Sequence, residues 1–418
     1  MVICKTHNAM IKKLTLILCA LMLAFCACEK PDSGGVDVPP PPINDNGGNG
    51  GNNNGGNDNN GGDNNGGGNG TETTGTHCTD IGQTPIILAY YTENSPKLPD
   101  VTLLTHINYA HGRFNDPTNG SGGIWIDKPE LMQKVIALKS KNPKLKVMLM
   151  IGGWGMKADG FSMMARDPAK RTEFCQSVKG LLDTYQLDGV DIDWEYPTYS
   201  AEGTGSHSSD TQNFNYVLKE LRETLGTTKI ISFASSASAK YVDWPEAIKY
   251  LDYVNVMTYD MGAAPKGHNS PLYRSQIFDQ RSCDDSIKEH VNKGIPRNRL
   301  NLGVPFYGKS DKNDDTYAYE VKYNEMDEIL NKGTYKGRSV AGKNIRRWDP
   351  VAFVPYLSDA ANKNYLSYDD PESVSYKGQY AVAQGLLGAM FWEYRHDDDN
   401  QSLLKALVQA MYGKENVL

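Results

Sequence analysis

The sequence of 418 residues lacks several patterns that mark large classes of protein. Lys and Arg number 43 against 50 Asp and Glu, and the net charge of −7 offers no electrostatic reason to expect nucleic-acid binding. The seven cysteines form no CxxC pair and no Cys/His ligand spacing, which disfavours a structural zinc site. No GxGxxG turn follows the first expected strand, so a dinucleotide site is not indicated. Neither a metal nor a cofactor is therefore expected.

The N-terminus has the pattern of an export signal. Lys12 and Lys13 precede an apolar run over residues 14–27, which is shorter than the roughly 20 residues of a membrane span. The run ends with Cys28 after Ala27, and this resembles a bacterial lipoprotein signal in which Cys28 is the lipidated residue. An ordinary secretory signal cleaved nearby is the alternative. We predict a signal segment over 1–28 and an exported, membrane-anchored lipoprotein at the bacterial cell surface or in the periplasm.

Residues 29–77 are predicted to form a disordered linker. Its central part, residues 44–70, contains only Gly, Asn and Asp. Such a chain has no apolar surface to offset the entropy of ordering its backbone, so it remains a flexible tether. Beyond it stand Cys78, Cys175 and Cys283; three thiols cannot all pair, and no disulfide is assigned. Cys175 follows Phe174 in an expected helix, where a buried position is favoured.

From residue 78 to 418, apolar runs alternate with segments of helical periodicity. This alternation favours a parallel sheet covered by helices, and eight units favour a (β/α)8 TIM barrel over a doubly wound open sheet. The interval 309–372, between the seventh and eighth strands, is long and weakly periodic, and we expect a small α+β insertion there. The expected helices cover residues 129–139, 169–185, 212–225, 286–293 and 401–411. The expected strands cover residues 86–91, 104–110, 145–152, 189–195, 229–235, 253–260, 301–307 and 386–392.

Three carboxylates occupy alternate positions in one expected strand: Asp191, Asp193 and Glu195. Because side chains alternate faces along a strand, all three carboxylates point to the same face, and successive ones are about 6.6 Å apart. In a barrel, that face is the interior. Crowded carboxylates share protons, and the group nearest the cleft, Glu195, is the natural general acid. A surface strand with a solvated acidic face is the alternative. Their place at the carboxyl end of a barrel strand favours catalysis, such as protonation of a glycosidic oxygen.

This run resembles the DxxDxDxE signature of glycoside hydrolase family 18, which contains chitinases and endo-β-N-acetylglucosaminidases. Similarity extends along the whole body, and the family fold agrees with the barrel expected from the pattern. Further segments that look like family motifs are residues 89–91, 151–154, 257–260, 303–308 and 391–392.

The resemblance implies a role for each matching side chain. Glu195 is implied to act as the acid and then as the base, and Asp193 to hold the substrate's own N-acetyl group, whose oxygen attacks the anomeric carbon. Tyr259 is implied to donate a hydrogen bond to that acetyl oxygen, and Asp191 to share a proton with Asp193.

Aromatic side chains are implied to form the sugar-binding surface, since sugar C–H faces pack on aromatic rings. Trp392 is implied to lie under the distorted sugar and Trp154 under the next one, although either ring could instead fill an end of the barrel. The remaining residues implied to line the pocket are Tyr90, Met257, Asp260 and Tyr307.

Two positions depart from the family pattern. The third-strand SxGG motif has Met150 in place of its serine, so Asp191 is expected to lose a hydrogen-bond partner. The second strand carries His111 where the family usually has an aromatic residue.

Three functions fit these residues. The first is a retaining hydrolase of β-1,4-linked N-acetylglucosamine polymers, a chitinase, and the Glu195-Tyr196-Pro197 run favours it. The second is an endo-β-N-acetylglucosaminidase acting on N-linked glycans. The third is a non-catalytic sugar-binding protein, which has no need of a general acid. In each case the expected partner is an N-acetylglucosamine-containing polysaccharide or glycan, together with a membrane through the lipid anchor and no nucleic acid.

Overall fold

The computed structural model describes residues 77–155, 160–200 and 203–418. The signal segment predicted for residues 1–28, with Cys28, and the linker predicted for 29–77 lie outside this part, apart from His77. Among the helices that are described, none has both the length and the hydropathy required to cross a bilayer. The predictions about export and anchoring thus concern residues that the structure does not describe.

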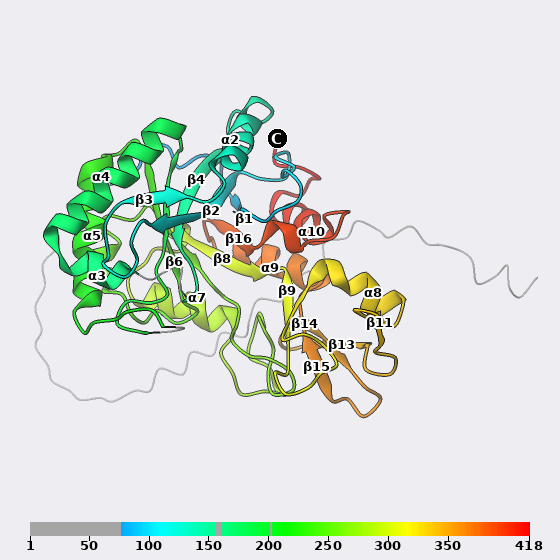
Figure 1. The fold of residues 1–418 in the computed structure, drawn as a ribbon. Helices are drawn as coiled ribbons and strands as arrows, with labels where there is room; N and C mark the ends of the chain where they lie inside the picture. The colour runs from blue at the N-terminus through cyan, green and yellow to red at the C-terminus, as the bar shows by residue number, and fades with distance from the viewer. Residues whose placement is uncertain (1–76, 156–159, 201–202) are drawn as a thin grey trace, which may run out of the picture. The chain divides into compact units, whose positions relative to one another are not determined.

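Eight parallel strands close into a barrel (Figure 1). Closure is direct, because the first strand pairs with the second, Leu88 opposite His106, and also with the last, Ile86 opposite Gly388. A short strand, β3 (Ile124–Ile126), adds an antiparallel edge to the second barrel strand. The barrel prediction is confirmed and the open sheet is excluded. The barrel strands are β1 (Ile86–Thr92), β2 (His106–Phe114), β4 (Lys146–Gly152), β5 (Gly189–Asp193), β6 (Ile230–Ser235), β7 (Tyr253–Val256), β8 (Leu300–Pro305) and β16 (Gly388–Trp392).

Helices surround the barrel (Figure 1). Their ends follow local chemistry: the Asp167 side chain accepts hydrogen bonds from the first-turn amides of α4, and Ser282 and Asp285 form a reciprocal cap at the start of α7. That cap begins α7 at Cys283, three residues before the expected start. The helices are α2 (Pro129–Ala137), α3 (Phe161–Arg166), α4 (Pro168–Tyr185), α5 (Asp210–Leu225), α6 (Trp244–Ala247), α7 (Cys283–Asn292), α9 (Pro371–Ala383) and α10 (Ser402–Tyr412).

The predicted alternation of β5 is confirmed by its packing. Val190, Ile192 and Trp194 belong to the apolar core between strands and helices. The Trp194 ring stacks on Phe161, with centroids 5.4 Å apart, and meets the edge of Phe214 at 5.8 Å. The alternate side chains of β5 therefore enter the barrel interior, where a smaller second core includes Leu88, Met150 and Met390. Cys175 is buried on α4, and Cys78, Cys175 and Cys283 are free thiols.

The interval between β8 and β16 contains an antiparallel sheet in the order β10-β9-β15-β14-β13. It begins at Tyr307, because the chain changes partner there: Pro305 still pairs with Trp392 of β16, whereas Tyr307 pairs with Lys322. The expected seventh strand, 301–307, was therefore two residues too long at its end. The elements of the interval are β9 (Tyr307–Ser310), β10 (Glu320–Lys322), α8 (Met326–Asn331), β11 (Thr334–Tyr335), β12 (Arg338–Ser339), β13 (Ile345–Asp349), β14 (Val354–Ser358) and β15 (Asn364–Ser367).

Two other expected strands end earlier than predicted, and both corrections concern the site. The strand expected over 189–195 ends at Asp193, so Glu195 lies just beyond β5. The strand expected over 253–260 ends at Val256, and Asp260 has a left-handed φ of 56° that extended chain cannot adopt. Glu195 and Tyr259 thus stand on the loops that leave the carboxyl ends of the barrel.

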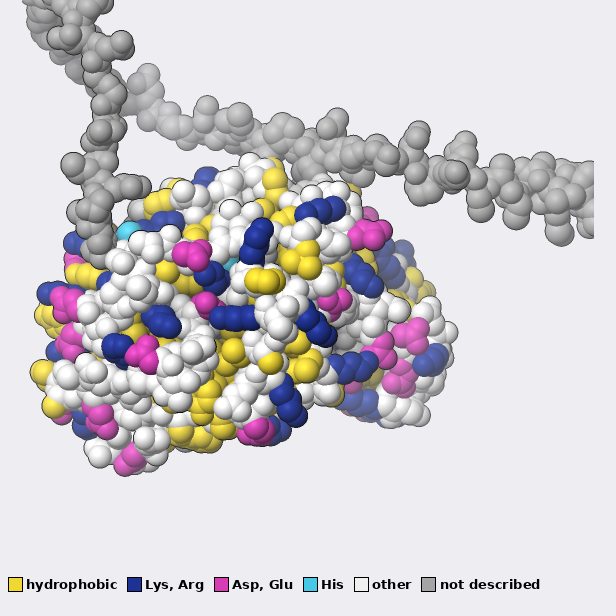
Figure 2. Space-filling model, turned by 90° about the horizontal axis from the view of Figure 1, so that it is seen from above, with side chains coloured by type: hydrophobic (Ala, Val, Ile, Leu, Met, Phe, Trp, Pro, Cys, Tyr) yellow, Lys and Arg dark blue, Asp and Glu magenta, His cyan; other side chains and the backbone are white. Residues whose placement is uncertain are grey.

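Charged side chains of both signs are spread over the face seen in Figure 2, with apolar side chains between them.

Candidate active site

A cleft of about 730 Å³ lies at the carboxyl ends of the barrel strands. Of the cleft residues predicted from the sequence, Asp191 is the one that does not line the cleft. Its side chain is fully buried in the barrel beneath the cleft floor. The others reach the cleft from different strands and loops, which brings together positions more than 300 residues apart. The predicted residues that line the cleft are Tyr90, Trp154, Asp193, Glu195, Met257, Tyr259, Asp260, Tyr307 and Trp392.

Asp191 is held by hydrogen bonds from three different strands. One carboxylate oxygen accepts from the Tyr90 hydroxyl at 2.8 Å, and the other accepts from Ser232 at 2.5 Å and from the Asn255 amide at 3.0 Å. Burial raises the pKa of Asp191 to about 6, and the hydrogen bonds oppose that rise. This carboxyl therefore retains a proton in weakly acidic solution far better than an exposed aspartate does.

These contacts correct the prediction that Asp191 loses a hydrogen-bond partner because Met150 replaces a serine. Strand register places Met150 on one side of Asp191 and Ser232 on the other. Met150 packs in the barrel interior, and Ser232 supplies a hydroxyl from the opposite neighbour. With Met150 in this position, Asp191 still receives a hydroxyl hydrogen bond, from Ser232 on another strand.

Glu195 is 9% exposed at the cleft. Burial raises the pKa of Glu195 to about 7, the negative charge of Asp260 adds to the rise, and a hydrogen bond with Tyr196 opposes it. A carboxylic acid that keeps its proton near neutral pH and faces a cleft can donate that proton to a bound leaving group.

Tyr259 stands beside the carboxylates. Burial, followed by the charges of Asp193 and Glu195, raises the pKa of Tyr259 well above its ordinary value, so the hydroxyl keeps its proton. Its ring meets the Tyr307 ring edge-on, with centroids 6.1 Å apart. Tyr259 is thus a fixed hydrogen-bond donor in the cleft wall.

Asp260 is part of an ion-pair chain in the same wall. The Tyr307 hydroxyl donates to Asp260 at 2.9 Å, and the Lys309 ammonium lies 3.1 Å from Asp260 and 3.2 Å from Glu320. Burial alone lowers the pKa of Lys309, but the charges of Asp260 and Glu320 raise it above its ordinary value. Lys309 is therefore a fixed positive charge between two carboxylates.

The two tryptophans occupy different depths. Trp392, half-buried at the end of β16, lies 5.6 Å from the Tyr90 ring between centroids. Trp154 is 51% exposed at the rim. Both rings line the cleft, so neither is confined to filling an end of the barrel, and both offer faces on which a sugar can pack.

Comparison with known proteins assigns the family. The family model for glycosyl hydrolases family 18 matches residues 86–397, which is most of the chain. The chain belongs to this family.

Relatives within family 18 agree with that assignment. Chitinase A1 of Niallia circulans is 32% identical over 406 residues, covering 78% of this chain and 58% of the relative. An endochitinase of Manduca sexta is 28% identical and covers 75% of this chain and 60% of the relative. The chain thus spans about three fifths of the length of these curated relatives.

Solved structures show the same architecture. The chitinase ChiW of Paenibacillus sp. str. FPU-7 superposes with a TM-score of 0.68 at 30% identity, covering 79% of this chain and 43% of that one. A family 18 N-acetylglucosaminidase of Paenibacillus barengoltzii superposes with a TM-score of 0.65 at 32% identity, covering 78% and 99%.

Sequence reasoning missed two kinds of residue at this site. Ser232 and Asn255 are polar residues at inward positions of otherwise apolar strands, a signal that could have been used. The others stand beyond the barrel strands, on loops or on the short strands β9 and β10, where the alternation of the barrel strands does not show which way a side chain points. Cleft residues of this second kind are Tyr199, Lys240, Tyr241, Arg281, Lys309, Lys312, Tyr319 and Glu320.

One group of potential metal ligands occurs in the described part of the chain: Glu93, His111 and Asp127, whose ligand atoms lie within 4.8 Å of one another. The Arg113 guanidinium lies 2.5 Å from Asp127 and 3.8 Å from Glu93, so a positive charge already balances the carboxylates. His111 lies 3.0 Å from Glu93 through Nδ1 and forms part of the cleft wall, 6.4 Å from the Trp392 ring. The group is an ion-pair network that positions His111.

A further motif proves to be structural. Residues 303–310 read GVPFYGKS and have the spacing of a phosphate-binding loop. Here the segment runs from β8 into β9 with no following helix, and Lys309 is engaged by carboxylates. The strand-loop-helix context that a phosphate loop requires is absent from this segment.

Proposed function

We propose that this family 18 protein is a retaining glycoside hydrolase that cleaves β-1,4-linked N-acetylglucosamine polymers, chitin or chitooligosaccharides. The observation that carries the proposal is a buried Glu195, its pKa raised by burial, facing an aromatic-lined cleft beside Asp193 and Tyr259. The names of the relatives, chitinase, endochitinase and N-acetylglucosaminidase, support the choice of sugar.

The reaction begins with proton transfer from Glu195 to the glycosidic oxygen, which breaks the bond to the anomeric carbon. The substrate's own N-acetyl oxygen forms the new bond to that carbon, giving a cyclic intermediate in place of a covalent enzyme ester. Water then attacks from the side that the leaving group vacated, and Glu195 takes the proton from it. Two displacements at one carbon retain its configuration.

Asp193 and Tyr259 hold the N-acetyl group during this step. The Asp193 carboxylate accepts the amide N–H, which increases the electron density on the acetyl oxygen, and Tyr259 donates to the acetyl oxygen as charge changes there. Asp191, with its pKa of about 6, shares a proton with Asp193 beneath the cleft. This arrangement has no use in a protein that only binds sugar.

Hydrolysis assays on two substrates test the proposal. Chitin oligosaccharides should be cleaved and a high-mannose glycoprotein should not; cleavage of the glycoprotein alone would contradict the assigned substrate. Glu195→Gln should lower kcat by about 10²- to 10⁴-fold while sugar binding persists, because only the proton donor is removed. Exposed Glu130 on α2 supplies the matched control, Glu130→Gln, which should keep full activity.

A stable analogue of the cyclic intermediate tests the part played by the substrate. A thiazoline derived from N-acetylglucosamine should bind at least about 10²-fold more tightly than the free sugar, since the enzyme is complementary to the reacting state. Equal affinity for the thiazoline and the free sugar would contradict a mechanism in which the substrate's acetyl group attacks the anomeric carbon.

We also propose, from the sequence pattern of the N-terminus, that the enzyme is exported and carries lipid on Cys28. Labelling with a radioactive fatty acid in a bacterial host should mark the wild-type chain and not Cys28→Ser. Label on neither protein would favour an ordinary secretory signal, and label on both would place the lipid on a residue other than Cys28.

A further inference from the structure

Basic side chains gather on one arc of the cleft rim. All of them come from segments that follow β6, β7 and β8, three neighbouring strands of the barrel. The basic side chains that line the cleft are Lys240, Arg281, Lys309 and Lys312.

Two of the four are balanced by carboxylates and two are not. Lys309 is paired with acidic residues of the wall, and Arg281 is paired with Glu289. Lys240 and Lys312 form no ion pair with any carboxylate among the described residues, and both ammonium groups are exposed. Within the described part of the chain, the arc therefore presents to the cleft two lysines that no carboxylate pairs with.

Lys312 is held in place by an aromatic ring. Its ammonium lies 4.4 Å from the centre of the Tyr319 ring, and the Lys309 ammonium lies 4.7 Å from the same centre. A cation over a tyrosine face is attracted by the ring while its N–H groups remain available. Lys312 is thus positioned without being neutralised.

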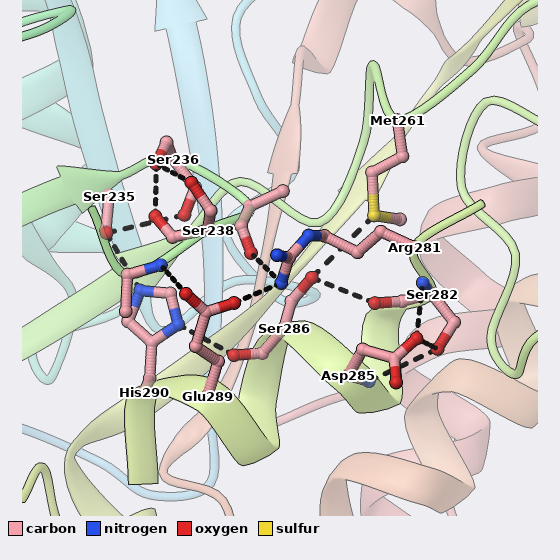
Figure 3. Close-up of polar contacts among 12 residues, drawn as sticks. Ser235, Ser236, Ser238, Met261, Arg281, Ser282, Asp285, Ser286, Glu289 and His290 are labelled. Carbon is pink, nitrogen blue, oxygen red and sulfur yellow. Dashed lines mark hydrogen bonds and ion pairs between the residues drawn. The ribbon is translucent and has the colours of Figure 1, made fainter. Parts of the chain in front are cut away.

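Lys240 stands on a loop that is anchored to α7. Figure 3 shows the Arg281 guanidinium directed at Glu289, and the other oxygen of Glu289 accepts from the Ala239 amide at 3.3 Å, one residue before Lys240. The neighbouring hydroxyl of Ser236 donates to the Ser238 carbonyl within the same loop. These contacts fix the backbone from which Lys240 extends.

A platform of tyrosine rings adjoins Lys240. Tyr241 stacks on Tyr196 with centroids 4.9 Å apart and planes 7° apart, and Tyr199 lies 5.9 Å from Tyr241. All three rings line the cleft. Because Lys240 and Tyr241 are adjacent in the chain and both line the cleft, a sugar unit packed on this platform lies near Lys240.

We propose that the cleft takes N-acetylglucosamine polymers that carry anionic substituents, carboxylate or sulfate, on the units bound along this arc. This inference rests on the proposed function and specifies its substrate class. Lys240 and Lys312 bind the anionic groups, and Lys309 offsets part of the negative charge of Asp260 and Glu320. Because both ammonium groups are exposed, each contributes a modest and salt-sensitive gain.

Three polymers of one backbone test the inference. Glycol chitin carries a neutral hydroxyethyl ether, carboxymethyl chitin carries a carboxylate on an ether of similar size, and sulfated chitin carries a sulfate ester. In low salt, kcat/KM should be about 3- to 10-fold higher on at least one anionic polymer than on glycol chitin, and the larger gain identifies the group. In about 0.5 M NaCl the ratio should fall toward one.

Single variants locate the effect. Lys240→Gln and Lys312→Gln should each lower the anionic-to-neutral ratio by about 1.5- to 5-fold, whereas Lys405→Gln, which removes an exposed charge from α10, should not change it. An unchanged ratio in both cleft variants would contradict the inference, as would equal rates on all three polymers.

Binding separates this inference from the proposed function. In Glu195→Gln, which cannot turn the substrate over, calorimetry should show tighter binding of carboxymethyl or sulfated oligosaccharides than of glycol oligosaccharides. Hydrolysis of glycol chitin without any charge preference would overturn the anionic substrate class alone. If no polymer is hydrolysed but anionic oligosaccharides still bind more tightly, only the proposed hydrolase activity is contradicted.

Discussion

The acidic floor of the cleft and its basic arc face the same substrate, but different forces hold their side chains. Asp191 is fully buried and receives hydrogen bonds from residues on three strands, while Lys312 stands in solvent beside one tyrosine ring. Burial changes the proton affinity of the floor groups, whereas solvent screens the charges of the arc.

This difference separates chemistry from selectivity. A proton donor near neutral pH needs a low-dielectric setting, which only the packed end of the barrel supplies. A charge that chooses among substrates acts from solvent and contributes little for each residue. Changes on the floor should therefore have large effects on rate or stability, and changes on the arc small ones.

Among changes that compare the floor with the arc, Tyr259→Phe is expected to have the largest effect on the reaction rate. It removes a donor that is aimed at the reacting acetyl group, so kcat should fall by about 10²- to 10³-fold with little change in KM. Steady-state kinetics on chitin oligosaccharides measure both values. A rise in KM at constant kcat would instead assign Tyr259 to ground-state binding.

The next effect concerns the pH dependence of stability. Because the folded-state pKa of Asp191 is raised to about 6, the folded protein binds more protons than the unfolded chain between about pH 4 and 6. The free energy of unfolding should therefore decrease as pH rises through that range, by on the order of 1–3 kcal/mol from this group. Asp191→Asn should reduce that slope in urea titrations at several pH values, and an unchanged slope would remove Asp191 as its source.

A smaller effect is expected from Ser232→Ala. Loss of the 2.5 Å hydrogen bond leaves one Asp191 oxygen less satisfied and should cost about 1–2 kcal/mol of unfolding free energy. The pKa of Asp191 should rise further, because the lost bond favours its charged form, and the acid limb of the rate profile should move to higher pH. Ser140→Ala, at an exposed position, is the control; equal behaviour of the two variants would contradict this role of Ser232.

The smallest effect is expected on the arc, from Glu289→Gln. This change loosens Arg281 and the Lys240 loop without touching the floor, so the free energy of unfolding should fall by less than about 1 kcal/mol. Activity on neutral oligosaccharides should change by less than about 5-fold. A loss as large as that of Tyr259→Phe would show that arc and floor are coupled.

Sequence patterns predicted well which segments form strands and which way their side chains point. They did not predict where a strand ends, because that depends on where its neighbouring strand stops pairing. The alternation in β5 located the carboxylates, yet the ends of β5, β7 and β8 were placed too late. Strand length depends on where the neighbours stop pairing, as at Pro305 and Tyr307, and no single segment contains that information.

The sequence by itself determined the family, the barrel and the inward direction of Asp191 and Asp193, because period-two alternation is a local property of the chain. Only the tertiary structure decided that Ser232 and Asn255 reach Asp191, since closure of the barrel decides which strands bring their inward side chains together. It also decided that the segments after β6, β7 and β8 bring their basic side chains to one arc, because the directions of these segments follow from packing that no periodicity records.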